Sequence, residues 1–531
     1  MHRLYIYLVV LPIVFVGCTD SKRDQKGLLD QSFVLAGNWP YAVTYEIFVQ
    51  SYCDSDGDGI GDFQGLTSKL DYLQDLGIEA VWLMPINPSP SYHKYDVVDY
   101  KDVHPDYGSL DDFRNFMDEA HKRNIKVVID LVINHTARDH PWFQEAISDT
   151  SSIYRDYYVW ANKDSIADQI AKKEVSLDSD NITQWHPVEG DAEHYYGFFW
   201  GGMPDLNFDN PMVREEIFEI GKFWLEEIGV DGFRLDAARH IFPDERANDN
   251  HQWWITFREE MEKINPNVQL IGEVWSEAEM VAPYLKGLPT LFNFDIGNEI
   301  IKAVNRENGQ DLITRHRRIR EFYNSVTKDF VDATFITNHD QNRVMSEVSG
   351  DHNKAKMAAS LLLTLPGSPY IYYGEEIGML GMKPDENIRE PFNWVTGSHS
   401  CEATWLAPTY TTEDHVASFE KQVDDTTSIY HHYKKLIASR NNHPVLTYGE
   451  LGLSDFYLPG TTSFYRIFDD DSALVLHNLT DTQISFKLTN GFQEIYFQTH
   501  WIQPPQNEIL NLPPYSSFVL TKETSNSADL N

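Results

Sequence analysis

Residues 229–240 read GVDGFRLDAARH, an apolar run that carries two charges, Arg234 and Asp236, two positions apart. Side chains of a β-strand alternate between its two faces, so Arg234 and Asp236 would share one face while Phe233 and Leu235 point to the other. Two interpretations fit this pattern: a structural ion pair near a strand end, or a charged pair that belongs to a functional site. Residues elsewhere in the chain decide between them.

The composition is that of a large globular protein. The chain has 531 residues, which exceeds the size at which a single core stops growing. Of these residues 42% are hydrophobic and 13% aromatic, a content that excludes a disordered chain. We therefore expect one large domain with smaller ones attached. The 81 acidic and 43 basic residues give a net charge of −38, which repels nucleic acids and anionic membrane surfaces and favours a neutral ligand or a cation.

The N-terminus has the features of an export signal. Residues 1–18 have a basic start and an apolar run of about 13 residues, too short to span a membrane, that ends in Gly17 and Cys18. A small residue followed by cysteine resembles the lipobox of bacterial lipoproteins, although Phe15 replaces the usual leucine. We expect residues 1–18 to be a signal peptide of lipoprotein type with Cys18 as the acylation site, and residues 19–37 to be a linker. The protein would then reach the periplasm, the outer membrane or the cell surface, with this anchor as its membrane contact; plain secretion is the alternative.

Two further cysteines, Cys53 and Cys401, lie far apart in the sequence. An extracytoplasmic compartment permits a disulfide bridge between them. The sequence does not distinguish such a bridge from two free thiols.

From about residue 40 to 440, short β-rich runs alternate with amphipathic helical stretches, the pattern of βα units around a parallel sheet. Eight such runs predict an α/β fold with a closed (β/α)8 TIM barrel. The candidate strands are AVTYEIFVQ (42–50), EAVWLMP (79–85), IKVVIDLV (125–132), DGFRLD (231–236), VQLIGEVW (268–275), LFNFDI (291–296), DATFITN (332–338) and PYIYYGEE (369–376).

Two regions depart from this pattern. Residues 136–208, after the third strand, are rich in Trp, Tyr, Asp and His and lack a clear period, which indicates an inserted domain B. After about residue 445, strands broken by turns alternate, as in TTSFYRIFDDDSALVLHNLTD (461–481), which indicates an all-β domain. We assign residues 38–135 and 209–445 to the barrel, 136–208 to the inserted domain and 446–522 to a C-terminal β-sandwich domain.

The polar residues at the ends of the predicted strands are unusually acidic. Asp236 closes DGFRLD, Glu273 follows VQLIG and Asp340 follows FITNH, while His135 and His339 occupy equivalent positions in DLVINH and FITNH. In a barrel of this kind, the residues at the carboxyl ends of the strands meet at one rim. Like charges close together repel, so a functional site explains this arrangement and stability does not.

Two carboxylates at a barrel mouth suit glycoside hydrolysis. One attacks the anomeric carbon or activates water, and the other, kept protonated by its neighbours, protonates the leaving oxygen. A third acid can stabilise the cationic transition state. Arg234, on the same face as Asp236, would keep that aspartate ionised and oriented. The charged pair in residues 229–240 is therefore interpreted as functional.

The chain resembles the α-amylase family, glycoside hydrolase family 13, from about residue 38 to its end. The motifs that carry this resemblance appear in order: GIEAVWLMP, DLVINH, MPDLN, GFRLDAARH, GEVW, FITNHD and GSPYIYYGEE. The resemblance implies that Asp236 is the nucleophile, Glu273 the general acid/base and Asp340 the transition-state stabiliser, with retention of anomeric configuration. It also implies that the sugar at the cleavage subsite is held by Tyr95, which stacks on it, and by His135, Arg234 and His339.

The segment DSDGDGIGD (54–62) alternates aspartates with glycines. Its oxygens can surround one hard cation, and we predict a Ca²⁺ site formed by Asp54, Asp56, Asp58, Asp62 and the Ile60 carbonyl. The loop resembles an EF-hand, but Gly65 stands where an EF-hand has its bidentate glutamate, so it is a related calcium loop; an acidic solvated turn is the alternative. A second Ca²⁺, known in many α-amylases, would use Asn134, Asp205 and the His240 carbonyl, and the sequence leaves that site open.

Three positions bear on the substrate. The segment MPDLN (203–207) is typical of a group of the family intermediate between oligo-1,6-glucosidases and neopullulanases, which narrows the substrate to α-glucans. Exo-acting α-glucosidases usually carry an aspartate three residues before the stacking tyrosine, where this chain has Tyr92, so we expect an endo-acting cleft. Lys94 replaces the usual glycine before that tyrosine, and we expect its side chain to reach into or narrow the cleft.

We therefore expect a monomeric extracytoplasmic enzyme that hydrolyses α-1,4 bonds of starch or maltooligosaccharides and has no nucleic-acid partner. Neopullulanase, cyclomaltodextrinase, α-glucosidase and transglycosylase activities of the same fold are the nearer alternatives. A non-enzymatic glucan-binding or transporter-associated protein is the remoter one, and the short apolar run and the three acids argue against it.

Overall fold

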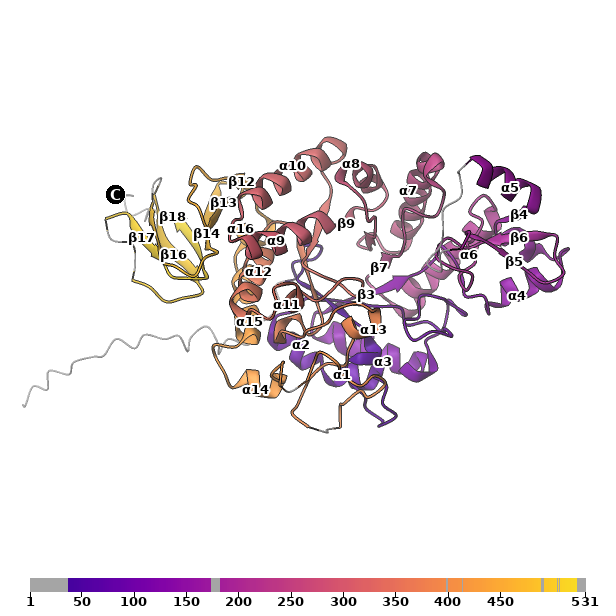
Figure 1. Ribbon diagram of the computed structural model, residues 1–531, viewed down its shortest axis with the longest axis horizontal. Helices are drawn as coiled ribbons and strands as arrows, with labels where there is room; N and C mark the ends of the chain where they lie inside the picture. Colours follow the sequence, from indigo (N-terminus) through magenta and orange to yellow (C-terminus); the bar gives the residue numbers. More distant parts are fainter. Residues whose placement is uncertain are drawn as a thin grey trace, which may run out of the picture. The chain divides into compact units, whose positions relative to one another are not determined.

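The computed structural model describes residues 37–172, 182–397, 400–412, 414–488, 491–503, 505 and 507–522 (Figure 1). The predicted signal peptide with Cys18, and the predicted linker up to residue 36, lie outside these ranges. No helix within them combines the length and the apolar character that crossing a membrane requires.

Eight parallel strands close into a barrel in the order β1-β11-β10-β9-β8-β7-β3-β2. The barrel closes because β1 pairs with β2 on one side, Thr44 opposite Ala80, and with β11 on the other, Thr44 opposite Tyr370. Each strand coincides with or overlaps one of the eight predicted runs, so the predicted (β/α)8 barrel is confirmed. The strands are β1 (Thr44–Ile47), β2 (Ala80–Leu83), β3 (Lys126–Leu131), β7 (Gly232–Leu235), β8 (Gln269–Gly272), β9 (Thr290–Phe292), β10 (Val331–Phe335) and β11 (Ser368–Tyr372).

Large side chains fill the inside of the barrel. Trp82, Phe292 and Tyr370 belong to one buried cluster, in which the rings of Phe292 and Tyr370 lie 5.0 Å apart. Gly232 permits the close approach of β7 to β8, because a Cβ there would lie 2.4 Å from the carbonyl oxygen of Gln269. The barrel is thus a packed core, and a ligand can reach only its rim.

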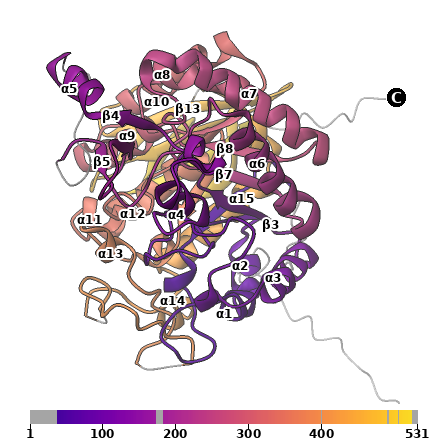
Figure 2. The same ribbon diagram turned by 90° about the vertical axis from the view of Figure 1, so that its right-hand side faces the viewer.

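Helices cover the outside of the barrel, and Figure 2 shows α3 next to β3 and α6 next to α7. Helix α3 begins with a capping box, in which Ser109 and Asp112 each accept the backbone N–H of the other. Its buried residues recur at helical spacing from Phe113 to Ala120. The helices are α1 (Phe63–Ser68), α2 (Leu70–Leu76), α3 (Leu110–Lys122), α4 (Pro141–Ser148), α5 (Lys163–Lys172), α6 (Pro211–Lys222), α7 (Ala247–Ile264), α8 (Ala278–Val281), α9 (Phe294–Arg306), α10 (Gln310–Val326), α11 (Val344–Glu347), α12 (His352–Thr364), α13 (Asp385–Ile388), α14 (Phe419–Val423), α15 (Ile429–Asn441) and α16 (Pro444–Tyr448).

The connection from β3 to β7 carries a small sheet of its own. Three antiparallel strands, in the order β4-β6-β5, are formed by Trp160–Asn162, Glu193–Tyr196 and Trp185–Pro187. The chain then returns along the end of β3, where the Leu206 N–H donates to the Asn134 carbonyl and His135 pairs with Asp205. The segment 203–207, MPDLN, therefore lies at the rim of the barrel.

The C-terminal region consists of antiparallel strands. Five form a sheet in the order β12-β13-β14-β18-β16, and two more, β15 and β17, pair separately. Arg466 of β13 is buried and donates to the carbonyl oxygens of Gly449 and of Thr364 on α12, which ties this region to the barrel. The strands are β12 (Glu450–Leu453), β13 (Thr461–Phe468), β14 (Asp471–Asn478), β15 (Ile484–Lys487), β16 (Phe492–Gln498), β17 (Ile509–Leu512) and β18 (Ser516–Lys522).

Cys53 and Cys401 form a disulfide bridge across a sequence separation of 348 residues. The bridge joins the chain just after β1 to the loop that follows α13. Next to it, the Gly59 carbonyl accepts the N–H groups of Thr404 and Trp405. The covalent bond and these two hydrogen bonds hold the aspartate-rich loop 54–62 against residues 401–405.

Replacing both cysteines, Cys53→Ser with Cys401→Ser, is expected to lower the midpoint of thermal unfolding. A bridge that closes a long segment restricts the unfolded chain, and its loss costs about 2–5 kcal/mol. Scanning calorimetry with and without reductant measures the effect: reductant should lower the midpoint of the wild type and leave the double variant unchanged. Equal midpoints for the two oxidised proteins would contradict the bridge.

Candidate active site

A cavity of about 520 Å³ lies at the carboxyl ends of the barrel strands. The structure brings Asp236, Glu273 and Asp340 together in its wall, as the sequence predicted. Of the four residues predicted to hold the sugar, Tyr95 and His135 also line the cavity, while Arg234 and His339 lie buried behind it. The lining residues are His93, Tyr95, His135, Phe199, Trp200, Met203, Asp236, Ala237, Arg239, His240, Glu273, Trp275, Asp340, Asp385 and Arg389.

The guanidinium of Arg234, only 1% exposed, joins three carboxylates. Its Nη1 donates to Asp236 Oδ1 at 2.7 Å and to both oxygens of Asp130 at 2.9 Å, and its Nη2 lies 2.7 Å from Glu273 Oε2. The predicted contact between Arg234 and Asp236 is therefore confirmed. Because these bonds are charge-assisted and buried, they fix the orientation of the carboxylates at the rim.

Sequence reasoning missed Asp130, which lies opposite Arg234 in the register of β3 and β7. Burial raises the pKa of Asp130 to about 7, although Arg234 acts against this shift. The sequence already shows Asp130 as an acidic residue inside the apolar stretch VVIDLV (127–132). A buried charge inside a strand needs a partner, and the neighbouring strand supplies it.

Glu273 lies in surroundings that favour its protonated form. Burial raises the pKa of Glu273, and the charges of Asp236 and Asp340 raise it further against the opposing effect of Arg234. The N–H of Ala237 donates to Glu273 Oε2 at 3.2 Å. Ala237 has φ of 47°, in the left-handed region that disfavours residues with a side chain, so the backbone after Asp236 is strained at the site.

Asp340 lies in surroundings that favour its ionised form. Burial would raise the pKa of Asp340, but the charge and hydrogen bond of His339, with the charges of Arg389 and Arg234, lower it well below its usual range. Arg389 Nη2 donates to Asp340 Oδ1 at 3.0 Å, and His339 Nε2 lies 3.2 Å from Asp340 Oδ2. Sequence reasoning missed Arg389 because it follows helix α13 and not a barrel strand.

A second missed residue, Glu46 of β1, holds His339 from behind. His339 Nδ1–H donates to Glu46 Oε1 at 2.5 Å, and both side chains are buried. Burial would lower the pKa of His339, but Asp340 and Glu46 outweigh it and raise that pKa to about 10. His339 is therefore an imidazolium at neutral pH. As with Asp130, the sequence shows Glu46 as a charged residue inside a buried strand, TYEI.

Tyr95 and His135 are both fixed by hydrogen bonds at the cavity wall. The Tyr95 hydroxyl donates to Asp130 Oδ2 at 3.1 Å and lies 2.7 Å from His339 Nε2, and its ring stacks on the His339 ring at 5.5 Å. His135 Nε2 lies 3.0 Å from the Tyr95 carbonyl oxygen, to which it donates. Burial lowers the pKa of His135, so this imidazole is neutral.

Two tryptophans present exposed aromatic faces to the cavity. Trp275 is 53% exposed and stacks on Phe294 with ring centroids 4.5 Å apart, and Trp200 of the inserted region is 39% exposed. Large aromatic side chains of this kind are usually buried, and exposed faces at a cavity suit the flat apolar faces of sugar rings.

The expectation that Lys94 reaches into or narrows the cleft is wrong. Lys94 is buried, and its ammonium group lies over the Tyr107 ring and 3.4 Å from Gln50 Oε1. Its backbone has φ of 62°, the left-handed conformation that glycine adopts easily. This turn directs the side chain into the core, where burial lowers the pKa of Lys94 to about 8.

Tyr92 lies outside the cavity lining and takes part in packing behind it. Its ring stacks on Trp405 at 5.4 Å, and its hydroxyl accepts a hydrogen bond from Arg389 Nη1 at 3.2 Å. Arg389 in turn binds Asp340. Tyr92 therefore supports the arginine that keeps Asp340 ionised.

Three of the aspartates in the predicted calcium loop lie close together. Carboxylate oxygens of Asp54, Asp56 and Asp58 lie within 4.8 Å of one another, and burial with neighbouring carboxylates raises the pKa of Asp58. Backbone N–H groups bind one oxygen each of Asp56 and Asp58 and hold the loop curled. Asp62 lies outside this group, because its carboxylate caps α1 at the Gly65 N–H and binds Ser55. The oxygens of the first three aspartates suit a hard cation such as Ca²⁺.

The second candidate cation site contains a buried carboxyl group. Asp205 Oδ1 accepts the Phe198 N–H at 3.0 Å, and burial raises the pKa of Asp205 to about 8. Asn134 lies next to it, since its side chain hydrogen-bonds Asp205. The His240 ring packs on Phe198 at 4.0 Å.

The charge on His339 predicts a pH-dependent stability. Its pKa of about 10 in the folded protein exceeds its ordinary value of 6.5, so its stabilising effect is complete below pH 6.5 and is lost as the pH rises through 10. Glu46→Gln removes one cause of the raised pKa, so the variant should be destabilised most at pH 6 and least at pH 10. Thermal unfolding midpoints of both proteins across this range measure the difference.

Glu79→Gln is the matched control for this experiment. Glu79 is as buried as Glu46, but its carboxylate binds Asn38 and no imidazole. Its substitution should change the midpoint by the same amount at pH 6.5 and pH 8.5, which lies below the pKa of about 10 of Arg440, the cation that Glu79 faces. A constant difference between wild type and Glu46→Gln over this range would mean that Glu46 contributes packing only.

Comparison with known proteins supports the same conclusion as the geometry. Residues 46–449 match the family described as alpha amylase, catalytic domain, and residues 462–519 match the alpha-amylase SusG C-terminal domain. Alpha-amylase 3 of Dictyoglomus thermophilum is 43% identical over 483 residues, which cover 90% of this chain and 93% of that protein. The 4-alpha-glucanotransferase of Thermotoga neapolitana is 36% identical over 453 residues, which cover 84% of this chain and 97% of that protein.

Among solved structures, the alpha-amylase from H.orenii is 42% identical, with a TM-score of 0.85 over 91% of this chain and 99% of that chain. The match to the family's catalytic domain spans the whole barrel and the acidic rim described above. The chain therefore belongs to the α-amylase family of glycosidases, glycoside hydrolase family 13.

Proposed function

We propose that this protein is a retaining hydrolase that cleaves α-1,4-glucosidic bonds within starch or maltooligosaccharide chains. The observation that carries the proposal is the opposite protonation preference of two acids in one cavity. Glu273 is driven toward its protonated form, while Asp340 is driven toward its ionised form. Acid–base catalysis of glycoside cleavage requires such a division between neighbouring carboxyl groups.

In the proposed mechanism Asp236 is the nucleophile. Its carboxylate attacks the anomeric carbon, and Glu273 transfers its proton to the leaving oxygen, which gives a covalent glycosyl-enzyme. Glu273, now ionised, takes a proton from water, and the oxygen of that water displaces Asp236 with overall retention. Arg234 binds Asp236 and Glu273 through its two terminal nitrogens, which keeps them close, as a retaining mechanism needs.

Asp340 and the aromatic side chains would act on the sugar itself. The ionised Asp340 would stabilise the positive charge that develops at the anomeric centre. Tyr95 would stack on the sugar at the cleavage subsite, with His135, Arg234 and His339 holding it. Trp200 and Trp275, exposed at the cavity, would bind neighbouring sugar units, and Tyr92 in place of an aspartate supports action inside chains. The segment MPDLN supports membership in the intermediate group of the family.

A transglycosylase is the second candidate. Trp275, stacked on Phe294 at the cavity, offers a platform for an acceptor sugar that could replace water in the second step. The 4-alpha-glucanotransferase relative supports this candidate. The two activities differ in their products, because transfer creates chains longer than the substrate.

The location and the metal are part of the proposal. The signal-like residues 1–18 support export with a lipid anchor at Cys18, and the bridge between Cys53 and Cys401 supports an oxidising compartment. Asp54, Asp56 and Asp58 would hold a structural Ca²⁺, which neutralises the aspartates and stiffens their loop. We propose that the enzyme acts as a monomer.

Asp236→Ala and Glu273→Gln are each expected to lower kcat on maltoheptaose by at least about 1,000-fold, because each removes a group that bonds or transfers a proton in the transition state. Both variants should unfold at temperatures close to that of the wild type. The wild type should release the α-anomer first, as followed by ¹H NMR, and should cut starch into short chains by chromatography. Digestion of pullulan and cyclodextrin in parallel separates the related activities.

Glu277→Gln, on the exposed surface near Glu273, is the control and should retain full activity. Turnover by Asp236→Ala near the wild-type rate would refute the assignment of the nucleophile. A β-anomer as first product would refute retention, and products longer than the substrate would favour the transglycosylase.

Removal of calcium is expected to lower the thermal unfolding midpoint of the wild type. A ligand present at 100 times its dissociation constant adds about 2.7 kcal/mol to stability. Asp56→Asn with Asp58→Asn should abolish the response to calcium, whereas Asp469→Asn with Asp470→Asn, which removes two acids from the C-terminal region, should preserve it. The same midpoint for the wild type in chelator and in calcium would rule out a structural ion.

A further inference from the structure

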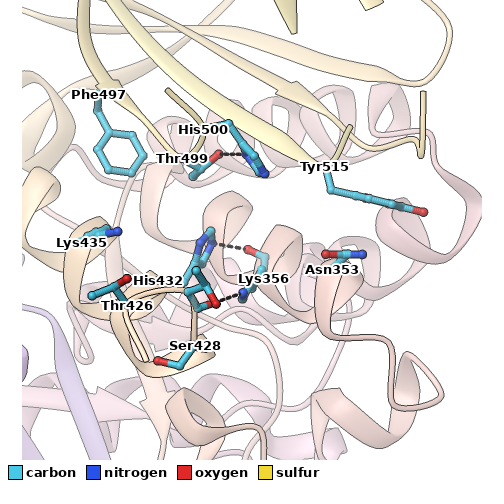
Figure 3. Close-up of a pocket in the computed structure, with 11 residues that line it drawn as sticks. Asn353, Lys356, Thr426, Ser428, His432, Lys435, Phe497, Thr499, His500 and Tyr515 are labelled. Carbon is cyan, nitrogen blue, oxygen red and sulfur yellow. Dashed lines mark hydrogen bonds between the residues drawn. The ribbon is translucent and has the colours of Figure 1, made fainter. Parts of the chain in front are cut away.

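A second cavity, of about 220 Å³, lies between barrel helices α12 and α15 and the C-terminal strands, and it shares no lining residue with the active-site cavity (Figure 3). The barrel side of its wall comes from α12, from α15 and from the loop that precedes α15. The opposite side comes from the end of β16 and the residue before β18. The lining residues are Asn353, Lys356, Thr426, Thr427, Ser428, His432, Lys435, Phe497, Thr499, His500 and Tyr515.

The lining of this cavity is basic. It contains two lysines and two histidines, Lys356, Lys435, His432 and His500, and none of its residues is acidic. The chain as a whole has 81 acidic and 43 basic residues, so the balance of charge in this wall is opposite to that of the chain. Such a wall creates a positive potential inside a protein that is otherwise strongly negative.

The lysines of the cavity have one acidic residue nearby, Asp425. Lys356 Nζ donates to the carbonyl oxygen of Thr427 at 2.5 Å, and neither Lys356 nor Lys435 forms an ion pair with any residue that the structure describes. Burial lowers the pKa of Lys356 and the charge of Lys435 lowers it further, while Asp425 acts in the opposite direction. Oδ1 of Asp425 accepts the N–H and the hydroxyl of Thr427, and Asp425 does not line the cavity.

The two histidines face each other across the cavity in Figure 3. Burial lowers the pKa of His432 to about 3, and the charges of Lys356, His500 and Lys435 lower it further. His500 Nδ1 lies 3.1 Å from the Thr499 hydroxyl, and its Nε2 has no hydrogen-bond partner among the described residues. The charge of Lys435 thus opposes that of Lys356, and an anion bound near both lysines would relieve this repulsion.

We propose that this cavity binds a phosphate group, either as inorganic phosphate or as the ester of a sugar. Lys356 and Lys435 supply the positive charge, and His500 with the Thr426 hydroxyl supplies further hydrogen bonds. A volume of about 220 Å³ exceeds what one phosphate fills and leaves room for an attached sugar ring. A phosphate held here bonds to both the barrel and the C-terminal region, so it also stabilises their contact.

Isothermal titration calorimetry on the full-length protein, at constant ionic strength in chloride, tests this site with inorganic phosphate, glucose 6-phosphate and glucose. Saturable binding of either phosphate compound, but not of glucose, is expected. The compound that binds more tightly shows whether the natural ligand is inorganic phosphate or a phosphate ester of a sugar. Lys356→Gln with Lys435→Gln should raise the dissociation constant for phosphate at least about tenfold, because the loss of one hydrogen bond to a charged group has an effect of that size.

Two further variants distinguish a loss of phosphate binding from a loss of folding or of overall charge. Lys435 is exposed, so Lys435→Gln alone should fold normally and still weaken phosphate binding. Lys328→Gln with Lys421→Gln removes two exposed lysines outside the cavity and should bind phosphate like the wild type. The proposal is overturned if the wild type binds neither phosphate compound, or if Lys435→Gln and the double cavity variant both bind them as the wild type does.

Discussion

The buried guanidinium of Arg234 binds Asp130, Asp236 and Glu273 at distances of 2.7–2.9 Å, and the rest of the active site depends on this cluster. Burial raises the pKa of Glu273, and since three carboxylates around one cation cannot all be neutralised, the remaining negative charge raises it further. Removing the cation from such a buried cluster typically costs about 3–5 kcal/mol, because the carboxylates then stay buried without compensation. The strand pairing of β3, β7 and β8 brings these residues together, and so the barrel must close before the site exists.

A second set of contacts fixes Asp340 from the opposite side. His339 and Arg389 both bind its carboxylate, and Glu46 keeps His339 charged. Arg389 also contacts Tyr92, whose ring stacks on Trp405. Trp405 and Thr404 bind the Gly59 carbonyl in the aspartate-rich loop, close to the bridge that ends at Cys401. The proposed calcium site and the disulfide therefore support the same wall of the cavity, although neither touches the catalytic acids.

Much of the fold and part of the site could be predicted from the sequence. The barrel strands are buried on both faces, so they appear as continuous apolar runs, and the acids at their carboxyl ends stand out against those runs. Asp130 and Glu46 were missed because the strand partner that balances a buried charge comes from another part of the chain. The prediction for Lys94 was wrong because a left-handed turn, which is invisible in the composition, directs its side chain into the core.

By itself the sequence determined which residue types stand at the strand ends, the order of the family motifs and the alternation of strands and helices. These features are local, since they follow from side-chain periodicity and short-range patterns along one segment. Only the tertiary structure decided the pairing of Cys53 with Cys401, the direction of Lys94 and the opposite protonation preferences of Glu273 and Asp340. The disulfide joins residues 348 positions apart, and the direction of Lys94 follows from its backbone conformation. The two protonation preferences depend on burial and on charges from other strands and loops, because electrostatic interactions act over distance in space and not along the sequence.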